Sequence, residues 1–478
     1  MPRLVMISLN DRGNLGARQL VARAKALGHE AFLINYGQYE HDTYKFTDDI
    51  DSPNRSHAKA VLVKLLHRLS PIDILGISYR SLMAELAADL ARTIREARVT
   101  YKLIIAGGIG ATSDPLQANT WANGYCVGEG DFAIGPLMAG KPLKEVQNIE
   151  SPSVHLANRA PLLANLDEAP FPDYDPDTTF AIVNGDLIEA DGRLDNDIGA
   201  YPLLTSRGCP RACTYCHNST VHNLYRGQTY VRQRSVENVM DEIAWARSRW
   251  EVKMLSIYDD LFIANPPWVF EFAKRLRQVW PVRPRFWCMT HPCYIREDVI
   301  SALVGSGLEE VCLGVQSGSE RILKLYRRGT SEKQILDAAE TLGRFPGLRV
   351  KIDIISANPM ETEQDLLDTM TVLQKIVNRC PNSYPGLSRL TIFPGSKIAD
   401  ELTQAECNAL HTDRQDFIDG LYRAAFVERW RILNLTDAMR RYNDFQTFRL
   451  ANTWPEDQGI LTDSHWQPLT TWLDKGAP

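Results

Sequence analysis

The stretch Thr205-Ser-Arg-Gly-Cys209-Pro-Arg-Ala-Cys213-Thr-Tyr-Cys216 carries three thiols at CxxxCxxC spacing. It follows at once on a short apolar run that we predict to be a β-strand. A loop at the end of a strand can direct three sulfur atoms towards one centre, and thiolates are the usual ligands of iron-sulfur clusters. Three protein ligands leave one iron of a four-iron cluster open to another molecule. We therefore predict Cys209, Cys213 and Cys216 as metal ligands.

A structural zinc site is the alternative for this triad. Zinc normally takes four protein ligands in a closed site, and His217 or His222 offers the fourth. No paired CxxC and no HxxxH stands near the triad, so the spacing favours the cluster. The other cysteines are dispersed, and we expect buried thiols there; Cys288 and His291, near the end of a predicted strand, are either core residues or substrate contacts.

Downstream of the triad, short apolar runs alternate with amphipathic segments. Six such strand-helix units over residues 199–400 predict a partial (β/α)6 barrel, with its site at the carboxyl ends of the strands. The spacing of Thr362 and Asp365 predicts a capping box at the start of the last helix. The predicted strands are Leu203–Ser206, Met254–Tyr258, Arg285–Met289, Glu310–Val315, Val350–Ser356 and Ser388–Phe393.

Upstream, residues 1–145 show the same alternation and predict a Rossmann-like, doubly wound parallel sheet. Residues 146–198, where periodicity fades and prolines gather, are predicted to be a linker, and residues 401–478 a mostly helical C-terminal cap. The class is therefore α/β. The predicted N-terminal strands are Leu4–Leu9, Ala31–Tyr36, Ile72–Tyr79, Tyr101–Ala106 and Gly124–Gly128.

Further motifs extend along the predicted barrel. They are Tyr258-Asp-Asp-Leu-Phe262, Gly314-Val-Gln-Ser-Gly-Ser-Glu320, Pro359-Met-Glu-Thr362 and Phe393-Pro-Gly-Ser396. Together with the cysteine triad, they resemble the radical S-adenosylmethionine (SAM) superfamily, and in particular its cobalamin-dependent subgroup, the class B methyltransferases. The resemblance implies a 4Fe-4S cluster whose open iron binds the amine and carboxylate of SAM. It also implies that the N-terminal domain binds cobalamin.

By the same resemblance, several residues are expected to meet SAM. Tyr215 would lie beside the adenine, Asp259 or Asp260 would meet the cofactor's ammonium group, and Gln316 and Ser317 would meet its ribose or carboxylate. The structural alternatives are that the carboxylates cap the next helix and that the Gly-Val-Gln-Ser-Gly run is a tight strand exit.

The N-terminal domain departs from one corrinoid motif. Many corrinoid-binding domains carry Asp-x-His-x-x-Gly, whereas this chain has Asp11-Arg-Gly13-Asn-Leu-Gly16, with glycine in the histidine's place. The resemblance therefore implies cobalamin without a histidine below cobalt. A nucleotide-binding or empty Rossmann-like domain is the alternative reading of its glycine-rich loops. The other predicted cobalamin-binding residues are Ser78, Ser81, Gly107, Gly108, Thr112, Gly128 and Gly130.

The resemblance implies a reaction in which SAM is cleaved reductively to a 5'-deoxyadenosyl radical and methylcobalamin methylates an unactivated carbon of a small molecule. A radical cyclase, ring-contracting or oxidising enzyme that uses cobalamin without methyl transfer is the alternative. A corrinoid carrier would not need the triad. Radical methylthiotransferases acting on tRNA usually have extra N-terminal cysteines, whereas this chain has only Cys126 in its first 200 residues.

The composition of the chain restricts the classes of partner and the cellular location that we expect. Lys and Arg number 53 against 59 Asp and Glu, a net charge of −6 that is scattered along the chain, so no nucleic-acid-binding stripe is expected. The start MPRLVMISLN lacks the long apolar region of a secretory signal, and no apolar segment reaches membrane-spanning length. We expect a cytoplasmic enzyme that receives electrons from a flavodoxin or ferredoxin.

Overall fold

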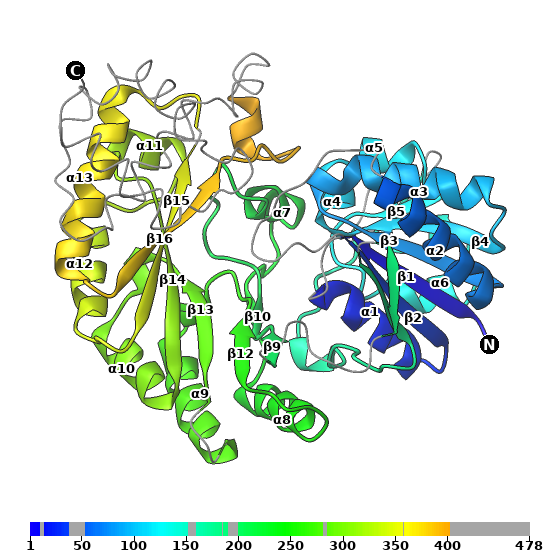
Figure 1. Cartoon of the computed structure of the whole chain (residues 1–478), viewed down its shortest axis with the longest axis horizontal. Helices are drawn as coiled ribbons and strands as arrows, with labels where there is room; N and C mark the ends of the chain where they lie inside the picture. Colours follow the sequence, from blue (N-terminus) through cyan, green and yellow to red (C-terminus); the bar gives the residue numbers. More distant parts are fainter. Residues whose placement is uncertain are drawn as a thin grey trace. The chain divides into compact units, whose positions relative to one another are not determined.

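Two α/β sheets organise the chain in the computed structural model (Figure 1). The structure describes residues 1–9, 14–37, 53–151, 159–183, 185–189, 199–280, 284–356 and 358–401. Asp11, Gly13 and the predicted cap after residue 401 lie outside these ranges. The chain divides into one unit of Met1–Pro210, Cys216–Met254 and Phe393–Ser396, and a second of Arg211–Tyr215, Leu255–Ile392 and Lys397–Pro478.

The N-terminal sheet has the strand order β6-β5-β4-β3-β1-β2-β7-β8. All neighbours from β5 to β7 are parallel, and the edge strands β6 and β8 are antiparallel. The predicted strands are confirmed as β1 (Arg3–Leu9), β2 (Glu30–Gly37), β3 (Ile72–Ser78), β4 (Tyr101–Gly107) and β5 (Gly124–Cys126). In this order, the chain reverses direction across the sheet between β1 and β3, which is where such sheets bind ligands.

Helices cover both faces of this sheet. On one face, α2 (Pro53–Leu69) and α3 (Ala84–Glu96) bury leucines and isoleucines against the sheet. On the other face, α1 (Leu15–Ala26) buries alanines and a valine, and α6 (Ile134–Met138) buries isoleucine, leucine and methionine. Strands buried on both sides explain why the sequence shows continuous apolar runs here rather than alternation.

More of residues 146–198 belongs to the sheet than the fading periodicity predicts. The expected linker contributes β6 (Ile149–Glu150), β7 (Thr179–Val183) and β8 (Asp186–Glu189) to the sheet. These strands are two to five residues long, too short for an apolar pattern to stand out. The domain boundaries themselves stay a prediction.

The second sheet has the order β16-β15-β14-β13-β12-β9. Its strands are β9 (Ala200–Leu203), β12 (Met254–Ile257), β13 (Phe286–Thr290), β14 (Leu308–Gln316), β15 (Arg349–Ser356) and β16 (Ser383–Arg389). The pairs from β12 to β16 are parallel, which confirms the α/β class. The alternating helices are α8 (Val236–Arg247), α9 (Pro266–Val279), α10 (Glu297–Ser306), α11 (Glu320–Leu325), α12 (Glu332–Gly343) and α13 (Glu363–Arg379).

The sixth barrel strand was misplaced by the sequence pattern. We predicted Ser388–Phe393, whereas β16 spans Ser383–Arg389 and contains Pro385 and Gly386. Both residues disfavour strands, but β16 is an edge strand, where proline is tolerated. Gly386 packs closely, because a Cβ there would lie 2.3 Å from the Asp353 carboxylate and that side chain would have to shift. The capping box of Thr362 and Asp365 on α13 is confirmed.

Candidate functional site

The cysteine loop begins at the end of a two-stranded β-ribbon. Strand β10 (Ser206–Arg207) pairs antiparallel with β11 (Arg232–Gln233), a pairing that the sequence did not reveal. Gly208 follows with φ +91°, and a Cβ there would lie 2.6 Å from the Tyr230 carbonyl oxygen, so only glycine fits. The loop then runs to α7 (Asn218–Leu224). The ribbon and this glycine thus fix the point from which the cysteines depart.

Cys209 and Cys216 are held by polar contacts within the first unit. The Nε2 atom of His222 lies 2.6 Å from the Cys209 carbonyl oxygen. The Ser219 hydroxyl donates to the Cys216 carbonyl at 2.8 Å, and the Asn218 amide donates to the Cys216 sulfur at 3.6 Å. His222, which the sequence offered as a zinc ligand, therefore contacts backbone.

Cys213 is buried in the second unit, with 3% of its surface exposed. The Arg328 guanidinium donates to its sulfur at 3.5 Å. Next to it, the backbone N–H of Thr214 donates to the Tyr326 carbonyl at 3.0 Å and its hydroxyl donates to the Leu325 carbonyl at 2.8 Å. These contacts attach the middle of the loop to the end of α11.

Hydrogen-bond donors aimed at sulfur suit ligands that carry negative charge. The donor set around Cys213 and Cys216 therefore fits an anionic iron-sulfur cluster. All three cysteines are free of disulfides. Within the described ranges no three His, Cys, Asp or Glu side chains are gathered as a metal site, so the ligand role of the triad stays a prediction.

Tyr215 packs edge-on against Tyr326, with ring centroids 4.9 Å apart. Both rings belong to an apolar cluster with Ile322, Ile355 and Leu390. This is an environment that can bury a flat ring, as expected for the neighbour of an adenine.

The structure separates the two predicted carboxylates after β12. Asp259 is fully buried. Burial raises the pKa of the Cys288 thiol well above its usual range, and Cys312 and Asp259 add to this effect. Asp260 is exposed. The two residues therefore face different environments, and Asp260 is the one open to solvent.

Gln316 and Ser317 end β14. Gln316 has a left-handed backbone, with φ +75°, at a break in the strand register. A Cβ at Gly314 would lie 2.7 Å from both the Gln316 amide and the Arg328 guanidinium, which places Gln316 beside the group that contacts Cys213. The Ser317 hydroxyl is buried and bonded to Thr369 and to the N–H of Ser319, which makes it part of a tight strand exit.

Small residues form the carboxyl end of the N-terminal sheet. Gly108 has φ +84°, and a Cβ there would lie 2.7 Å from the Tyr79 carbonyl oxygen. The Thr112 hydroxyl accepts from the N–H of Gly128 at 3.0 Å and donates to the Gly108 carbonyl at 3.1 Å. It joins the loops after β4 and β5, and its expected contact with cobalamin stays a prediction.

Other predicted residues at this edge differ in the space and the hydrogen-bonding capacity that they leave for a ligand. Gly107 has an extended backbone and a Cβ there would meet nothing within 4 Å. The Ser81 hydroxyl oxygen is buried and has no hydrogen-bond partner among the described residues. Ser78 accepts from Asn14 at 3.2 Å, and Gly16 lies inside α1. Among the described residues predicted at this edge, Gly107 therefore leaves room for a ligand and Ser81 leaves bonding capacity for one.

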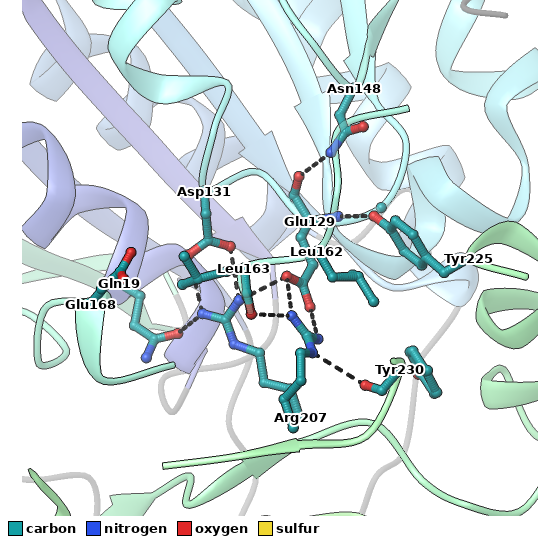
Figure 2. Close-up of polar contacts among 12 residues, drawn as sticks. Gln19, Glu129, Asp131, Asn148, Leu162, Leu163, Glu168, Arg207, Tyr225 and Tyr230 are labelled. Carbon is teal, nitrogen blue, oxygen red and sulfur yellow. Dashed lines mark hydrogen bonds and ion pairs between the residues drawn. The ribbon is translucent and has the colours of Figure 1, made fainter. Parts of the chain in front are cut away.

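A buried charge cluster, which the sequence did not reveal as a site, joins the loop after β5 to the β10–β11 ribbon. Figure 2 shows Glu129 and Asp131 facing Arg207. Arg207 donates to Asp131 at 2.8 Å and to Glu129 at 3.2 Å, and Arg232 donates to Glu129 at 3.0 Å. The backbone N–H of Glu129 also donates to the Tyr225 hydroxyl at 2.8 Å. We call Glu129, Asp131, Arg207 and Arg232 the ribbon clamp.

The ribbon clamp acts close to the cysteine loop, because Arg207 stands two residues before Cys209. The side chain of Arg232 is only 4% exposed and that of Asp131 only 8%. Burial alone would raise the pKa of Asp131, but the charge and hydrogen bonds of Arg207 outweigh it and lower the pKa. Both acids lie in the Gly128-Glu-Gly-Asp131 motif, and their partners lie far along the chain.

His291 and Cys288 are core residues in this structure. The Nδ1 atom of His291 accepts from the N–H of Cys293 at 3.1 Å, and Nε2 lies 3.3 Å from the Arg328 carbonyl. Nε2 therefore carries the proton. Burial, with the charges of Arg328 and Arg211, lowers the pKa of His291 to about 3. Cys288 is 1% exposed.

We expect this histidine to destabilise the fold in mild acid. Its folded pKa lies below the ordinary value of 6.5, so between pH 6.5 and about 3 the unfolded chain binds a proton that the folded chain does not. The free energy of unfolding should fall by about 1.4 kcal/mol for each pH unit below 6.5. Urea unfolding at pH 7 and pH 5 measures this, and a His291→Gln variant should lose that part of the slope. Equal slopes in both proteins would contradict it.

A family model for the radical SAM superfamily matches residues 203–373. The chain is also 26% identical over 386 residues to an uncharacterized methyltransferase of Pyrococcus horikoshii, covering 77% of this chain and 76% of that protein. It is 31% identical over 238 residues to a tRNA-2-methylthio-N(6)-dimethylallyladenosine synthase of Acetivibrio thermocellus, covering 46% of this chain and 47% of the synthase. Thus the chain spans about half the length of that synthase.

Two solved structures share the fold. One is the radical SAM methyltransferase TsrM of Kitasatospora setae, with a TM-score of 0.60 at 14% identity over 83% of this chain and 75% of TsrM. The other is the cobalamin-dependent SAM radical enzyme OxsB, with a TM-score of 0.60 at 19% identity over 86% of this chain and 56% of OxsB. In the described ranges, every helix is too short or too polar to cross a membrane.

Proposed function

We propose that this chain, an enzyme whose residues 203–373 match the family model of the radical S-adenosylmethionine superfamily, is a cobalamin-dependent C-methyltransferase. Its substrate would be a small molecule with an unactivated carbon, and its electrons would come from a flavodoxin or ferredoxin in the cytoplasm. The observation that carries the proposal is that one chain combines the CxxxCxxC loop with a doubly wound sheet. At the carboxyl edge of that sheet, Gly107 leaves free space beside the backbone.

The likeness to relatives supports this proposal. TsrM has been described with cobalamin and a 4Fe-4S cluster bound, and OxsB with aqua-cobalamin and SAM. The likeness to both extends over more than four fifths of this chain, so it includes the N-terminal sheet as well as the barrel. A relative described as a methyltransferase supports the transfer of a methyl group.

The residues present fit these cofactors. At the edge of the N-terminal sheet, Gly107 leaves a space that a side chain would fill, and Ser81 holds a buried hydroxyl without a partner in the described chain. Both would meet cobalamin. Around the triad, Asn218 and Arg328 point N–H groups at two of the three sulfurs. Cys209, Cys213 and Cys216 would hold the cluster.

The cluster would supply one-electron reductive cleavage of SAM, and the corrinoid a transferable methyl group. The chain itself orients and shields these groups. Thr214 fixes the middle of the cysteine loop to α11, while Tyr215 and its apolar neighbours keep water from the adenine side. Gln316, beside Arg328, offers an amide to the carboxylate or ribose of SAM.

A side chain at Gly107 should block the corrinoid without harming the fold. We expect Gly107→Val to weaken cobalamin binding at least about tenfold, since the extended backbone accepts valine and the new side chain enters the open space. Equilibrium dialysis against hydroxocobalamin measures this, and the iron content should not change. Gly347→Val is the matched control, because a Cβ there also meets nothing within 4 Å. Unchanged affinity in Gly107→Val would count against this edge as the corrinoid site.

The function itself is tested by following the methyl group. Anaerobic enzyme, loaded with cobalamin and given SAM labelled in its methyl group, should convert its substrate to a product that is one methylene unit heavier and carries the label. An active enzyme whose product has lost hydrogen and gained no label would instead be a radical cyclase or oxidising enzyme, the second candidate.

A tRNA methylthiotransferase is favoured by one observation, the likeness to the Acetivibrio synthase, which covers under half of each chain. Those enzymes usually carry a second cluster on N-terminal cysteines. Here Cys126 is the one cysteine before residue 200, and it is buried, which raises the pKa of its thiol to about 12. We therefore rank this function below carbon methylation.

A further inference from the structure

A chain of contacts runs from one predicted cluster ligand to another through three side chains. The Asn218 amide nitrogen donates to the Cys216 sulfur at 3.6 Å, and the Tyr230 hydroxyl donates to the Asn218 amide oxygen at 2.6 Å. The Tyr230 ring packs against His222, with centroids 4.5 Å apart. His222 in turn contacts the Cys209 carbonyl at 2.6 Å. All of these residues lie in the first unit.

The two partners of the Asn218 amide together favour one orientation, with its oxygen at the Tyr230 hydroxyl and its NH2 group at the sulfur. Asn218 is 3% exposed, so its amide has few other partners to choose between. With the hydroxyl of Tyr230 donating to the amide oxygen, the NH2 end is turned towards Cys216. The reverse orientation would place a carbonyl oxygen against an anionic sulfur, which is repulsive. The geometry is therefore that of an oriented donor to the third cysteine.

Cys213 has a donor of its own. The Arg328 guanidinium reaches its sulfur at 3.5 Å, and the arginine is 8% exposed. A second hydrogen bond, from Arg328 to the Gly314 carbonyl, keeps the guanidinium in place. A buried positive charge at one sulfur adds to the neutral amide at another.

We propose that Asn218 and Arg328 raise the reduction potential of the 4Fe-4S cluster, and that Tyr230 positions Asn218 for this task. The inference rests on the proposed function, since it requires the cluster. On reduction, one electron from a one-electron donor enters the cluster and no covalent bond changes. The reduced cluster carries one more negative charge, so N–H groups at its cysteine sulfurs stabilise it more than the oxidised form. Losing a donor moves the potential to more negative values.

The test is a mediated redox titration of anaerobically reconstituted, full-length protein, followed by the EPR signal of the reduced cluster. Asn218→Leu removes the amide at similar size, and Arg328→Gln removes the charge. Tyr230→Phe keeps the ring but frees the amide to turn. We expect the midpoint to become more negative in all three variants. Asn223→Leu, an exposed asparagine on the same helix, is the matched control and should titrate like the wild type.

The outcomes separate the inference from the function. Equal midpoints in wild type and in iron-loaded Asn218→Leu and Tyr230→Phe overturn the inference and leave the cluster standing. If Asn218→Leu loses its iron, Tyr230→Phe decides the matter, because that variant leaves every group beside the sulfurs in place. A wild-type protein that takes up no iron overturns the proposed function, and the inference with it.

Discussion

Replacing Cys213 with alanine is expected to give a folded protein without its cluster and without detectable cleavage of SAM. The remaining two thiols cannot hold a four-iron cluster that already lacks one protein ligand. Iron and sulfide should therefore fall to near zero, and 5'-deoxyadenosine should not form. Iron analysis, the absorbance spectrum and chromatography of the reaction mixture measure this.

Cys380→Ala is the matched control for that experiment. Cys380 is as buried as Cys213, but it caps the end of α13, with Asn382 as its sulfur's partner at 3.4 Å. We expect this variant to keep its iron and its activity. If Cys213→Ala kept a full complement of iron and still cleaved SAM, the triad would not be the ligand set, and a corrinoid carrier would become the better description.

Breaking the ribbon clamp should cost more stability than any surface ion pair. Glu129→Gln leaves the guanidinium of Arg232, which is 4% exposed, without its carboxylate. An uncompensated buried charge costs about 3–5 kcal/mol. Urea unfolding measures the loss. Because Arg207 stands two residues before Cys209, we also expect the variant to lose iron more readily to a chelator.

Two further variants show whether the loss of stability comes from the buried charge. Glu309→Gln breaks the exposed pair with Arg285, at 2.8 Å, and should cost about 0–1 kcal/mol. Arg232→Met combined with Glu129→Gln removes both partners and should recover part of the loss. A loss below 1 kcal/mol in Glu129→Gln alone would mean that the clamp is no more than a surface contact.

The parts of the fold that were predictable are those with a local signal. Strands β1 to β5 are buried on both faces, so their sequences are continuous apolar runs. The capping box that begins with Thr362 involves residues only three positions apart, so its spacing is visible in the sequence. The position of β16 was predicted wrongly because Pro385 and Gly386 normally argue against a strand, although an edge strand can contain them. β7 pairs with the distant β2, β8 pairs with β7 in a short hairpin, and both strands carry too few residues for a pattern.

In the candidate site, too, some features have a local signal in the sequence and others do not. The cysteine loop is a local motif, and its place after a strand followed from the apolar run before it. The ribbon clamp was missed because Glu129 and Arg232 are 103 residues apart, and nothing in a sequence pairs charges at that distance. The expected cofactor contacts of Thr112 and Ser317 stay predictions; the Thr112 hydroxyl bonds to neighbouring loops, and that of Ser317 bonds to Thr369 on α13. A polar residue at a strand end predicts a loop contact as readily as a ligand.

The most direct test of the account is the metal and cofactor content of the protein purified without oxygen from cells supplied with cobalamin. We predict a brown protein with about four iron and four sulfide per chain, and one cobalamin released on denaturation. A correctly folded protein that is repeatedly colourless and free of iron would contradict the account.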